Sequence, residues 1–304
     1  MLKYVVKRFF ISLLTLFILA TVVFFLLHSL PGDPISSNNG ILPKELMNKL
    51  RAHYGLDQPV WKQYIQYFAN MFRGELGYSL KHANRTVASV IRESFPVSAS
   101  LGLRGLALGY PIGVLLGVIA ARRRGKPADY ICIIIGILAI SVPSFILARI
   151  LQWIFSVKLG WLPVAQWKGF KYTILPVFCM AFGMMNGRSM RAYMLEVVSQ
   201  DYIKTAKAKG VPERRRVWRH MFRNAMLPMV TGLGPLVAGA LTGTFVIETI
   251  FSIPGLGKQY VDAVKGLDYT LAMGLTTFFA AFLIFANFMV DLAYGLVDPR
   301  VRIE

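Results

Sequence analysis

Long apolar stretches, separated by short polar segments, set the pattern of this chain. A membrane-spanning helix needs about 20 mainly apolar residues to cross a hydrocarbon layer of about 30 Å. Six stretches are long enough, at residues 9–30, 95–121, 128–157, 172–195, 225–253 and 270–297. The pattern therefore predicts an all-α polytopic membrane protein with six transmembrane helices.

The first apolar stretch follows three basic residues, Lys3, Lys7 and Arg8, as a secretory signal would. Its apolar part is longer than that of a signal peptide, and residues 27–32 lack a small-x-small cleavage site. We therefore expect residues 1–30 to form a cytoplasmic tip and a retained first span.

Basic residues concentrate in alternate loops. The N-terminus carries three Lys and Arg residues, 122–126 carries four, and 188–223 carries ten against three acids. Residues 158–171 carry only three, and 254–269 balance two basic against two acidic residues. Because basic loops stay in the cytoplasm, both ends are predicted to lie inside, with 298–304 as a cytoplasmic tail.

Residues 31–94 form a longer polar segment that is predicted to lie outside. Its Pro-Gly-Asp-Pro start, at 31–34, should end the first helix. Residues 44–53 and 59–72 have the pattern of short helices, and the second carries aromatic side chains at helical spacing. This indicates a small folded extracytoplasmic insert, followed by a five-helix core at 95–297.

Composition agrees with a membrane location, since 55% of the 304 residues are hydrophobic and 16% are charged. The net charge of +19 is spread between the apolar stretches. Bilayer topology therefore accounts for it, and no nucleic-acid partner is expected. The two cysteines, Cys132 and Cys179, lie inside apolar stretches without metal-ligand spacing. We predict neither a disulfide framework nor a metal site.

The cytoplasmic loop at 196–224 contains two predicted helices. Residues 201–209 have the pattern of a short helix, in which three residues share one side: Tyr202, Ala206 and Lys209. Gly210 suits the C′ position of this helix, and Pro212 suits the first position of the next one. Small residues before a glycine corner let a helix approach another protein closely, so we predict a docking element here.

Beyond Pro212, five apolar residues fall on one helical stripe: Val217, Trp218, Met221, Phe222 and Ala225. A basic amphipathic helix of this kind suits the lipid headgroup boundary. We predict a membrane-interface anchor made of Arg215, Trp218, Arg219 and Arg223. A basic loop kept in the cytoplasm by its charge alone would explain the arginines as well.

Seven short segments follow one another along the chain: 30–34 (LPGDP), 53–59 (HYGLDQP), 73–79 (RGELGYS), 201–210 (DYIKTAKAKG), 223–228 (RNAMLP), 253–257 (IPGLG) and 297–300 (VDPR). Each segment alone is weakly specific. In this order and spacing they resemble the inner-membrane permease subunits of binding-protein-dependent ATP-binding-cassette importers. The resemblance covers nearly the whole chain and is closest to the B-type permeases of oligopeptide, dipeptide and nickel systems.

The resemblance implies a type I importer permease fold with a coupling loop that docks in a cleft of the cytoplasmic ATPase. The residues that correspond to this loop are Asp201, Lys204, Thr205, Ala206, Ala208 and Gly210. Lys204 stands where the wider family has glutamate, and the distance from Gly210 to Pro228 is longer than in sugar-type permeases. Both departures also resemble the peptide branch, so no single acidic docking contact is assumed.

The resemblance also implies the location and the partners. The location is the cell inner membrane, crossed several times, and the partners are a second homologous permease, two ATPase subunits and an external substrate-binding protein. This chain has no phosphate-binding motif, because Lys258 is followed by Gln259 and Lys126 by Pro127. We therefore expect no enzyme activity and no bound cofactor, with ATP and Mg used by the ATPase subunits.

Ionisable residues inside a span cost about 2.5–3.5 kcal/mol at a helix centre, so they face protein or water. The candidates inside the predicted spans are Arg104, Arg149, Glu248 and Asp291. Each either contacts substrate in the translocation path, or forms an interhelical ion pair or lies near the membrane interface. We retain Arg104 and Glu248 as translocation-path candidates.

The function expected from these features is that of a permease subunit in an ATP-driven importer of di- and oligopeptides, forming half of the pathway. The same features fit import of nickel or another small solute, because selectivity in the family lies largely in the binding protein. An ion-driven secondary transporter would need intramembrane acids, and only Glu248 and Asp291 are available. A membrane scaffold without transport is a third alternative.

Overall fold

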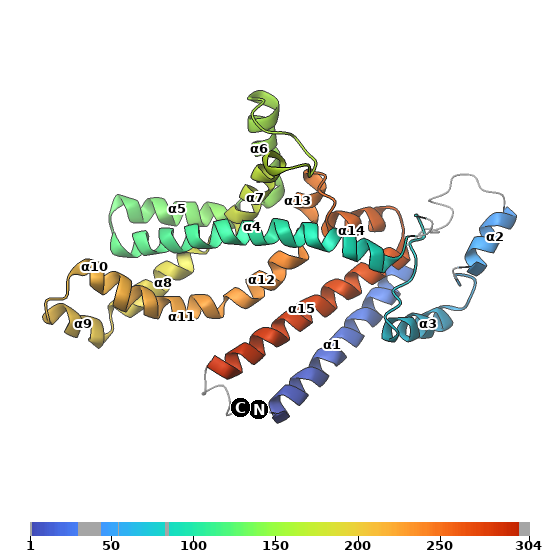
Figure 1. The fold of residues 1–304 in the computed structure, drawn as a ribbon, viewed down its shortest axis with the longest axis horizontal. Helices are drawn as coiled ribbons and strands as arrows, with labels where there is room; N and C mark the ends of the chain where they lie inside the picture. The colour runs from blue at the N-terminus through green and yellow to red at the C-terminus, as the bar shows by residue number, and fades with distance from the viewer. Residues whose placement is uncertain (1, 30–43, 54, 83–84, 298–304) are drawn as a thin grey trace. The chain divides into compact units, whose positions relative to one another are not determined.

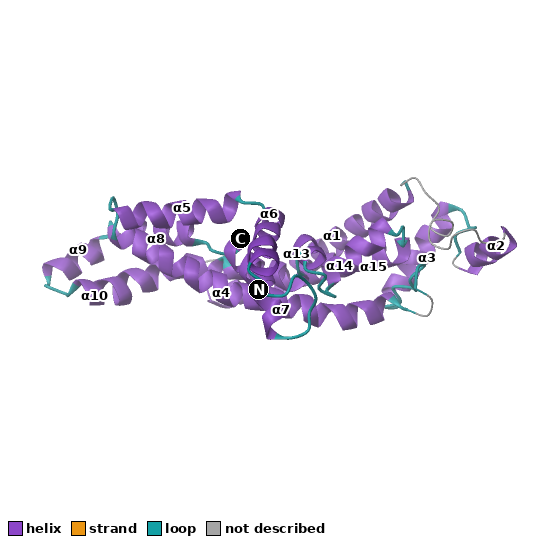
Figure 2. Cartoon of the chain, turned by 90° about the horizontal axis from the view of Figure 1, so that it is seen from above, coloured by secondary structure: helices purple, strands orange, loops and turns teal. Residues whose placement is uncertain are grey.

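The computed structural model describes residues 2–29, 44–53, 55–82 and 85–297. Within these residues the regular structure is helical, which confirms the expected all-α class (Figures 1 and 2). The described part of the chain forms two compact units, Met1–Ser98 with Pro254–Glu304, and Ala99–Ile253. The predicted turn at 31–34, the tail at 298–304 and the side chain of Asp291 lie outside the described residues.

The first unit is built on α1 (Leu2–His28) and α15 (Tyr269–Val297), which lie side by side and antiparallel (Figure 1). Its shorter helices are α2 (Lys44–His53), α3 (Val60–Phe72) and α14 (Leu256–Lys265). The helices predicted at 44–53 and 59–72 are thus confirmed. Side chains from α1, α4, α14 and α15 form the buried core of this unit: Phe24, Leu27, Val87, Val90, Leu256, Ala263, Leu271 and Leu275.

The second unit contains most of α4 (Val87–Arg122), together with α5 (Pro127–Ser141), α7 (Phe170–Gly183) and α8 (Gly187–Val198). A row of glycines lets neighbouring helices touch the α4 backbone, and it comprises Gly102, Gly105, Gly109, Gly113 and Gly117. A Cβ atom on Gly109 would lie 2.1 Å from the Ala181 carbonyl oxygen, and one on Gly113 2.6 Å from the Asn186 nitrogen. Small residues at this spacing are typical of helix packing in membranes.

The stretch predicted as one span at 128–157 is strongly bent. It consists of α5, α6 (Ser144–Leu151) and a π-helical segment, Gln152–Lys158, with an angle of 102° between the two halves. The cause is Pro143, which disfavours helical geometry at the preceding residue, so that Val142 is extended with φ −80° and ψ 115°.

Two further predicted spans are interrupted. The stretch at 172–195 divides into α7 and α8 at residues 184–186. The stretch at 225–253 divides into α11 (Arg223–Thr231), α12 (Leu233–Thr242) and α13 (Phe245–Ile250). Among the described residues, four helical segments are long and apolar enough to cross a membrane, or five if the bent pair counts as one span. They are Val5–His28, Val87–Arg122, Leu233–Ile250 and Tyr269–Met289.

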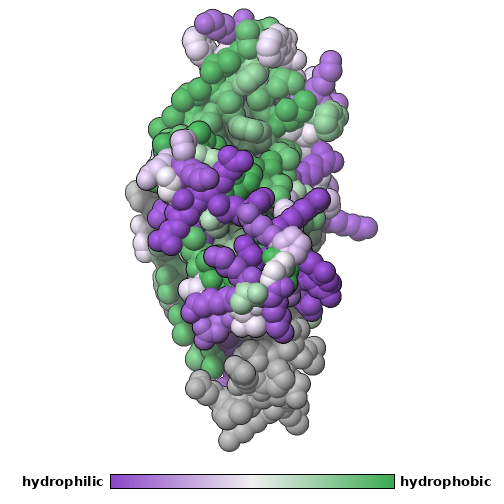
Figure 3. Space-filling view, turned by 90° about the vertical axis from the view of Figure 1, so that its left-hand side faces the viewer, coloured by the Kyte–Doolittle hydropathy of each residue, from purple (hydrophilic) through white to green (hydrophobic). Residues whose placement is uncertain are grey.

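Polar side chains gather at one end of the second unit. This end carries α9 (Asp201–Ala208) and α10 (Glu213–Arg215), and Figure 3 shows the hydrophilic side chains gathered there, with hydrophobic surface above them. Both helices belong to the basic loop that was predicted at residues 196–224, between two apolar stretches.

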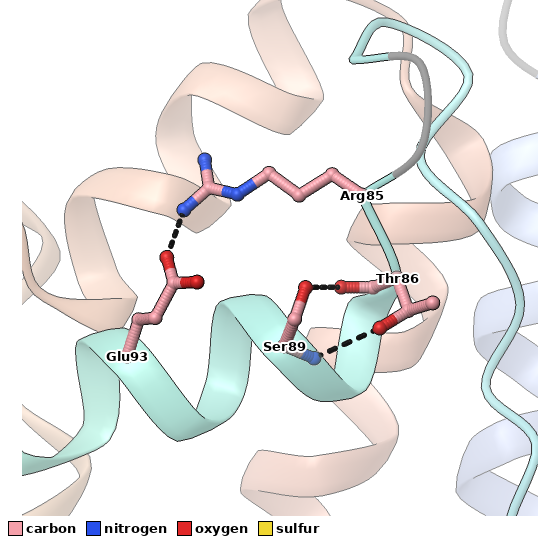
Figure 4. Close-up of polar contacts among 4 residues, drawn as sticks. All are labelled: Arg85, Thr86, Ser89 and Glu93. Atoms are coloured by element: carbon pink, nitrogen blue, oxygen red, sulfur yellow. Dashed lines mark hydrogen bonds and ion pairs between the residues drawn. The ribbon is translucent and has the colours of Figure 1, made fainter.

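The start of α4 differs from the prediction, because the helix begins at Val87 and not at residue 95. Thr86 caps it: the Ser89 N–H donates to Thr86 Oγ1 at 3.0 Å, and the Ser89 hydroxyl donates to the Thr86 carbonyl at 2.7 Å (Figure 4). Arg85 then reaches Glu93 at 2.5 Å. The apolar pattern does not include the first two turns of α4, because they contain the charged residues Arg92 and Glu93.

Candidate coupling site

Helix α9 is the short helix that was predicted after residue 200. Its N-cap, Gln200, is extended, and Asp201 occupies the first turn, where a negative charge is favoured by the helix dipole. Lys204 Nζ lies 2.8 Å from Asp201 Oδ1 in an exposed pair. The helix ends at Ala208, one residue before the predicted end.

A glycine closes α9 in the way that the sequence predicted. The Gly210 N–H donates to the Lys207 carbonyl at 3.0 Å, and the Val211 N–H donates to the Ala206 carbonyl at 3.1 Å. Together these two bonds form a Schellman motif. Gly210 has φ +73°, a conformation that costs most other residues about 1–2 kcal/mol. The corner is therefore fixed by backbone geometry.

Pro212 lies one position earlier in its helix than predicted. With φ −58° and ψ 145° it is the N-cap of α10 and not the first helical residue, because its ψ lies outside the helical range. The chain therefore turns across 209–212, and α10 leads directly into a π-helical segment, Arg216–Phe222, and then into α11.

The face that α9 turns toward the protein differs from the predicted one. Ile203 and Ala206 are buried, whereas Tyr202 and Lys209 are exposed. Ala206 therefore lies on the inner side of α9 and not on a docking surface shared with Tyr202. The exposed residues of the predicted loop are Asp201, Lys204, Thr205, Ala208 and Gly210.

Ile203 packs α9 against a hydrophobic cluster in the second unit. The cluster draws residues from α4, α8, the second π-helical segment and α11: Val114, Val118, Ala121, Met190, Met194, Val217, Met221, Ala225 and Met229. The Tyr110 hydroxyl adds a hydrogen bond to the Met229 carbonyl at 2.9 Å. A displacement of α9 would thus act on three helices through packed side chains.

The predicted apolar stripe after Pro212 is divided. Val217, Met221 and Ala225 are buried, whereas Trp218 is 43% exposed and its ring packs 5.2 Å from that of Phe222. The arginines predicted to form an anchor, Arg215, Arg219 and Arg223, are exposed beside it. A shallow hollow of about 640 Å³ is lined by Pro212, Arg214, Arg215, Trp218 and Arg219.

An ion pair that sequence analysis missed holds α8 to the start of α5. Arg191 Nε donates to Asp129 Oδ1 at 2.7 Å and its NH2 donates to Oδ2 at 2.8 Å, while the Gly125 N–H donates to Oδ2 at 3.0 Å. Asp129 is 2% exposed. The sequence carries one sign of this ion pair, because Asp129 is a single acid that directly follows a strongly basic loop. Its partner, Arg191, is 62 positions away and could not be inferred from the sequence.

The charged residues inside the predicted spans have separate environments. Arg104 is exposed on α4, with its guanidinium 5.8 Å from the Trp167 ring centre. Glu248 is fully buried in α13. Arg149 donates to Gln152 Oε1 at 3.2 Å, and Gln152 in turn donates to the Val164 carbonyl at 2.7 Å. The contact between Arg149 and Gln152 is local and its partner is a neutral side chain, so it is not the interhelical ion pair that was one alternative for Arg149.

Comparison with known proteins bears directly on this chain. The family described as "Binding-protein-dependent transport system inner membrane component" matches residues 113–303. A companion family, "Binding-prot-dependent transport system membrane comp, N-term", matches residues 1–102. The chain belongs to this permease family.

Relatives match the permease over its whole length. The dipeptide transport system permease protein DppB of Bacillus subtilis is 41% identical over 306 residues, covering 100% of this chain and 99% of the relative. DppB of Lactococcus lactis subsp. cremoris is 39% identical over 305 residues, covering 100% of both chains. The oligopeptide transport system permease protein OppB of Haemophilus influenzae is 39% identical over 306 residues, covering 99% of this chain and 100% of the relative.

Family membership and the apolar helices together place the permease in the inner membrane as a multi-pass protein. It is a membrane component of an importer in which ATPase activity belongs to separate subunits.

Proposed function

We propose that the permease is one of two homologous permease subunits in an ATP-driven importer of dipeptides and oligopeptides. The names of its full-length relatives support this substrate class. The chain would cross the membrane six times with both ends in the cytoplasm, and an external binding protein would deliver substrate to the face formed by residues 31–94. Two cytoplasmic ATPase subunits would bind ATP and Mg.

The observation that supports this proposal is the packing of α9 against the second unit. One side of this helix is packed through Ile203 onto the cluster shared by α4, α8 and α11, while the opposite side is exposed and polar. Closure of the ATPase subunits would push on the exposed residues Asp201, Lys204, Thr205 and Ala208. Because the inner side is tightly packed and Gly210 fixes the corner, the push would move the spans and not merely deform a loop.

The arginines beyond Pro212 would have a separate task. Arg215, Trp218, Arg219 and Arg223 would rest at the headgroup boundary, where each basic side chain near an anionic surface contributes about 1 kcal/mol. Exposure of Trp218 beside the arginine-lined hollow supports this anchor. Arg104 and Glu248 remain candidates for the translocation path, Arg104 because it is exposed on α4.

The test of the coupling assignment is the substitution Gly210→Val. At φ +73° a β-branched residue is strongly disfavoured, so the Schellman corner should open and α9 should lose its fixed position. In proteoliposomes with the purified partner subunits, we expect uptake of labelled dipeptide to fall several-fold relative to ATP hydrolysis. The matched control is Gly210→Asn, since asparagine tolerates this conformation and should retain most of the uptake.

Normal dipeptide uptake by Gly210→Val, with the variant inserted in the membrane, would contradict the coupling assignment. Uptake of nickel without uptake of any peptide by the unmodified complex would instead contradict the substrate class. Purification of the chain without ATPase subunits in mild detergent would favour a transporter that works alone.

A further inference from the structure

Helix α3 was expected in an external subdomain, but it packs along the apolar helices of the first unit. The Tyr64 hydroxyl lies 2.9 Å from the Thr21 hydroxyl of α1, and the Phe68 ring centre lies 4.8 Å from that of Phe17. The Tyr67 hydroxyl lies 2.5 Å from the Thr277 hydroxyl of α15. These contacts fix α3 against both helices.

The contacts also show how far α3 descends beside them. Gln63, near its N-terminus, contacts His28 at the end of α1 at 3.2 Å. Phe17, which meets Phe68, precedes His28 by eleven residues, or about 16 Å along the helix. If the candidate span Val5–His28 of α1 crosses a hydrocarbon layer about 30 Å thick, the C-terminal half of α3 is at the level of the acyl chains.

One face of α3 is apolar and exposed. Trp61, Ile65 and Phe72 are 60%, 58% and 72% exposed, and at 100° per residue they fall on one side of the helix. The polar residues of α3 occupy another face. Three of them, Gln63, Gln66 and Asn70, border a second cavity of about 360 Å³, whose lining mixes polar and apolar residues. Helix α3 thus separates a polar side from an apolar one.

The apolar side contains a groove of about 630 Å³ between α1, α3 and α15. Thr277 is the single polar residue of its lining, and its hydroxyl already contacts Tyr67. The other lining residues are apolar: Phe10, Leu13, Leu14, Leu16, Phe17, Met71, Phe72, Leu76, Phe278 and Ala281. Exposure of such a surface to water would be unfavourable, at roughly 25 cal/mol per Å².

We propose that this groove binds the acyl chain of a phospholipid, and that α3 is inserted in the bilayer. Two walls of the groove belong to the candidate spans of α1 and α15, and outward side chains of spans meet acyl chains. At the shallow end of α3, Lys62 Nζ lies 5.6 Å from the Trp61 ring centre. Tryptophan beside a basic residue is typical of the headgroup level. The N-terminal end of α3 therefore suits the headgroups, and its C-terminal end, beside the groove, suits the acyl chains.

Spin labels can test this occupant in the intact complex. Cys132→Ser and Cys179→Ala give a background without cysteine, to which Phe72→Cys, Ile65→Cys or Gln66→Cys is added one at a time. Each variant is labelled with a nitroxide in phospholipid nanodiscs together with its partner subunits. Collisions with oxygen, which partitions into lipid, are then compared with collisions with a water-soluble nickel chelate. Co-purification with the partner subunits selects the variants that assemble correctly.

The proposal requires labels at 65 and 72 to collide more with oxygen than with the chelate, and the label at 66, on the polar face, to show the reverse. Phe72 lines the groove, so preference for the chelate at 72 would mean that water covers it. The same preference at 65, on the exposed face of α3, would mean that α3 lies outside the bilayer; either result would overturn the proposal. Protection of 72 from both reagents would overturn it too, because a second protein chain would then occupy the groove. None of these outcomes depends on which substrate the importer carries.

Discussion

Two ion pairs in the second unit show how burial decides the value of a charge. Asp129 accepts two hydrogen bonds from Arg191 and one from the Gly125 N–H while being 2% exposed. Arg122 and Glu213 lie 3.2 Å apart, but their side chains are 43% and 63% exposed. Water screens the second pair, so it should contribute less than about 1 kcal/mol.

Single substitutions in the two pairs should differ in their effect on stability. Asp129→Asn should lower the stability of the permease by about 3 kcal/mol, because it leaves the guanidinium of Arg191 without its charged partner. The measurement is thermal unfolding of the complex in detergent. Arg122→Gln is the matched control, and its transition should stay within the error of the unmodified protein.

Equal shifts in the two variants would show that Asp129 and Arg191 have no special structural value. A charge swap, Asp129→Arg with Arg191→Asp, offers a second check. The swap should recover only part of the lost stability. The carboxylate would then be at position 191 on α8, where it cannot accept the hydrogen bond that the Gly125 N–H donates to Asp129.

Helix α4 owes its packing to glycines that touch backbone. The Cβ of an alanine at 109 would lie 2.1 Å from the Ala181 carbonyl oxygen, which cannot move without displacing α7. Gly239 in α12 has no atom within 4 Å of its Cβ position. We therefore expect opposite signs for the same substitution in two helices.

Gly109→Ala should destabilise the permease by about 1–3 kcal/mol through overpacking. Gly239→Ala should stabilise it by about 0.5–1 kcal/mol, because alanine loses less backbone entropy in a helix. Thermal unfolding and the yield of the assembled complex would measure both effects. If Gly109→Ala were as stable as Gly239→Ala, the close approach of α4 and α7 would be refuted.

The helices themselves were largely predictable from local patterns. The periodicity at 44–53, 59–72 and 201–209 gave helices within one residue of their observed ends. The interruptions were harder, because apolar composition does not distinguish a straight span from a bent one. Pro143 was visible in the sequence and marks the position of the bend, but a proline alone does not give the angle of 102° between the two halves.

The coupling site was predictable only where its chemistry is local. Gly210 and its corner follow from residues that are neighbours in sequence. The burial of Ala206 and the partnership of Asp129 with Arg191 depend on helices brought together from distant positions, which one sequence does not reveal. The glycine row on α4 could have been found, since its members recur every three or four residues.

The number of spans is a property of the whole molecule, and the interrupted stretch of α7 and α8 decides it. If this stretch crosses the membrane, residue 168 lies outside while residues 126 and 204 lie inside. If it does not cross, residues 168 and 204 lie on the same side. Lys126, Lys168 and Lys204 are exposed, so each can be replaced by cysteine without disturbing the core.

In the cysteine-free background, these single cysteines can be labelled with a membrane-impermeant maleimide in right-side-out and inverted vesicles. Six spans predict that Lys168→Cys reacts in right-side-out vesicles, and that Lys126→Cys and Lys204→Cys react only in inverted ones. Lys265→Cys, at the C-terminal end of α14, should behave like Lys168→Cys, since it precedes the last span. Reaction of Lys168→Cys and Lys204→Cys from the same side would refute the six-span topology. It would also count against the proposed coupling role of α9, which requires this helix to lie in the same compartment as the ATPase subunits.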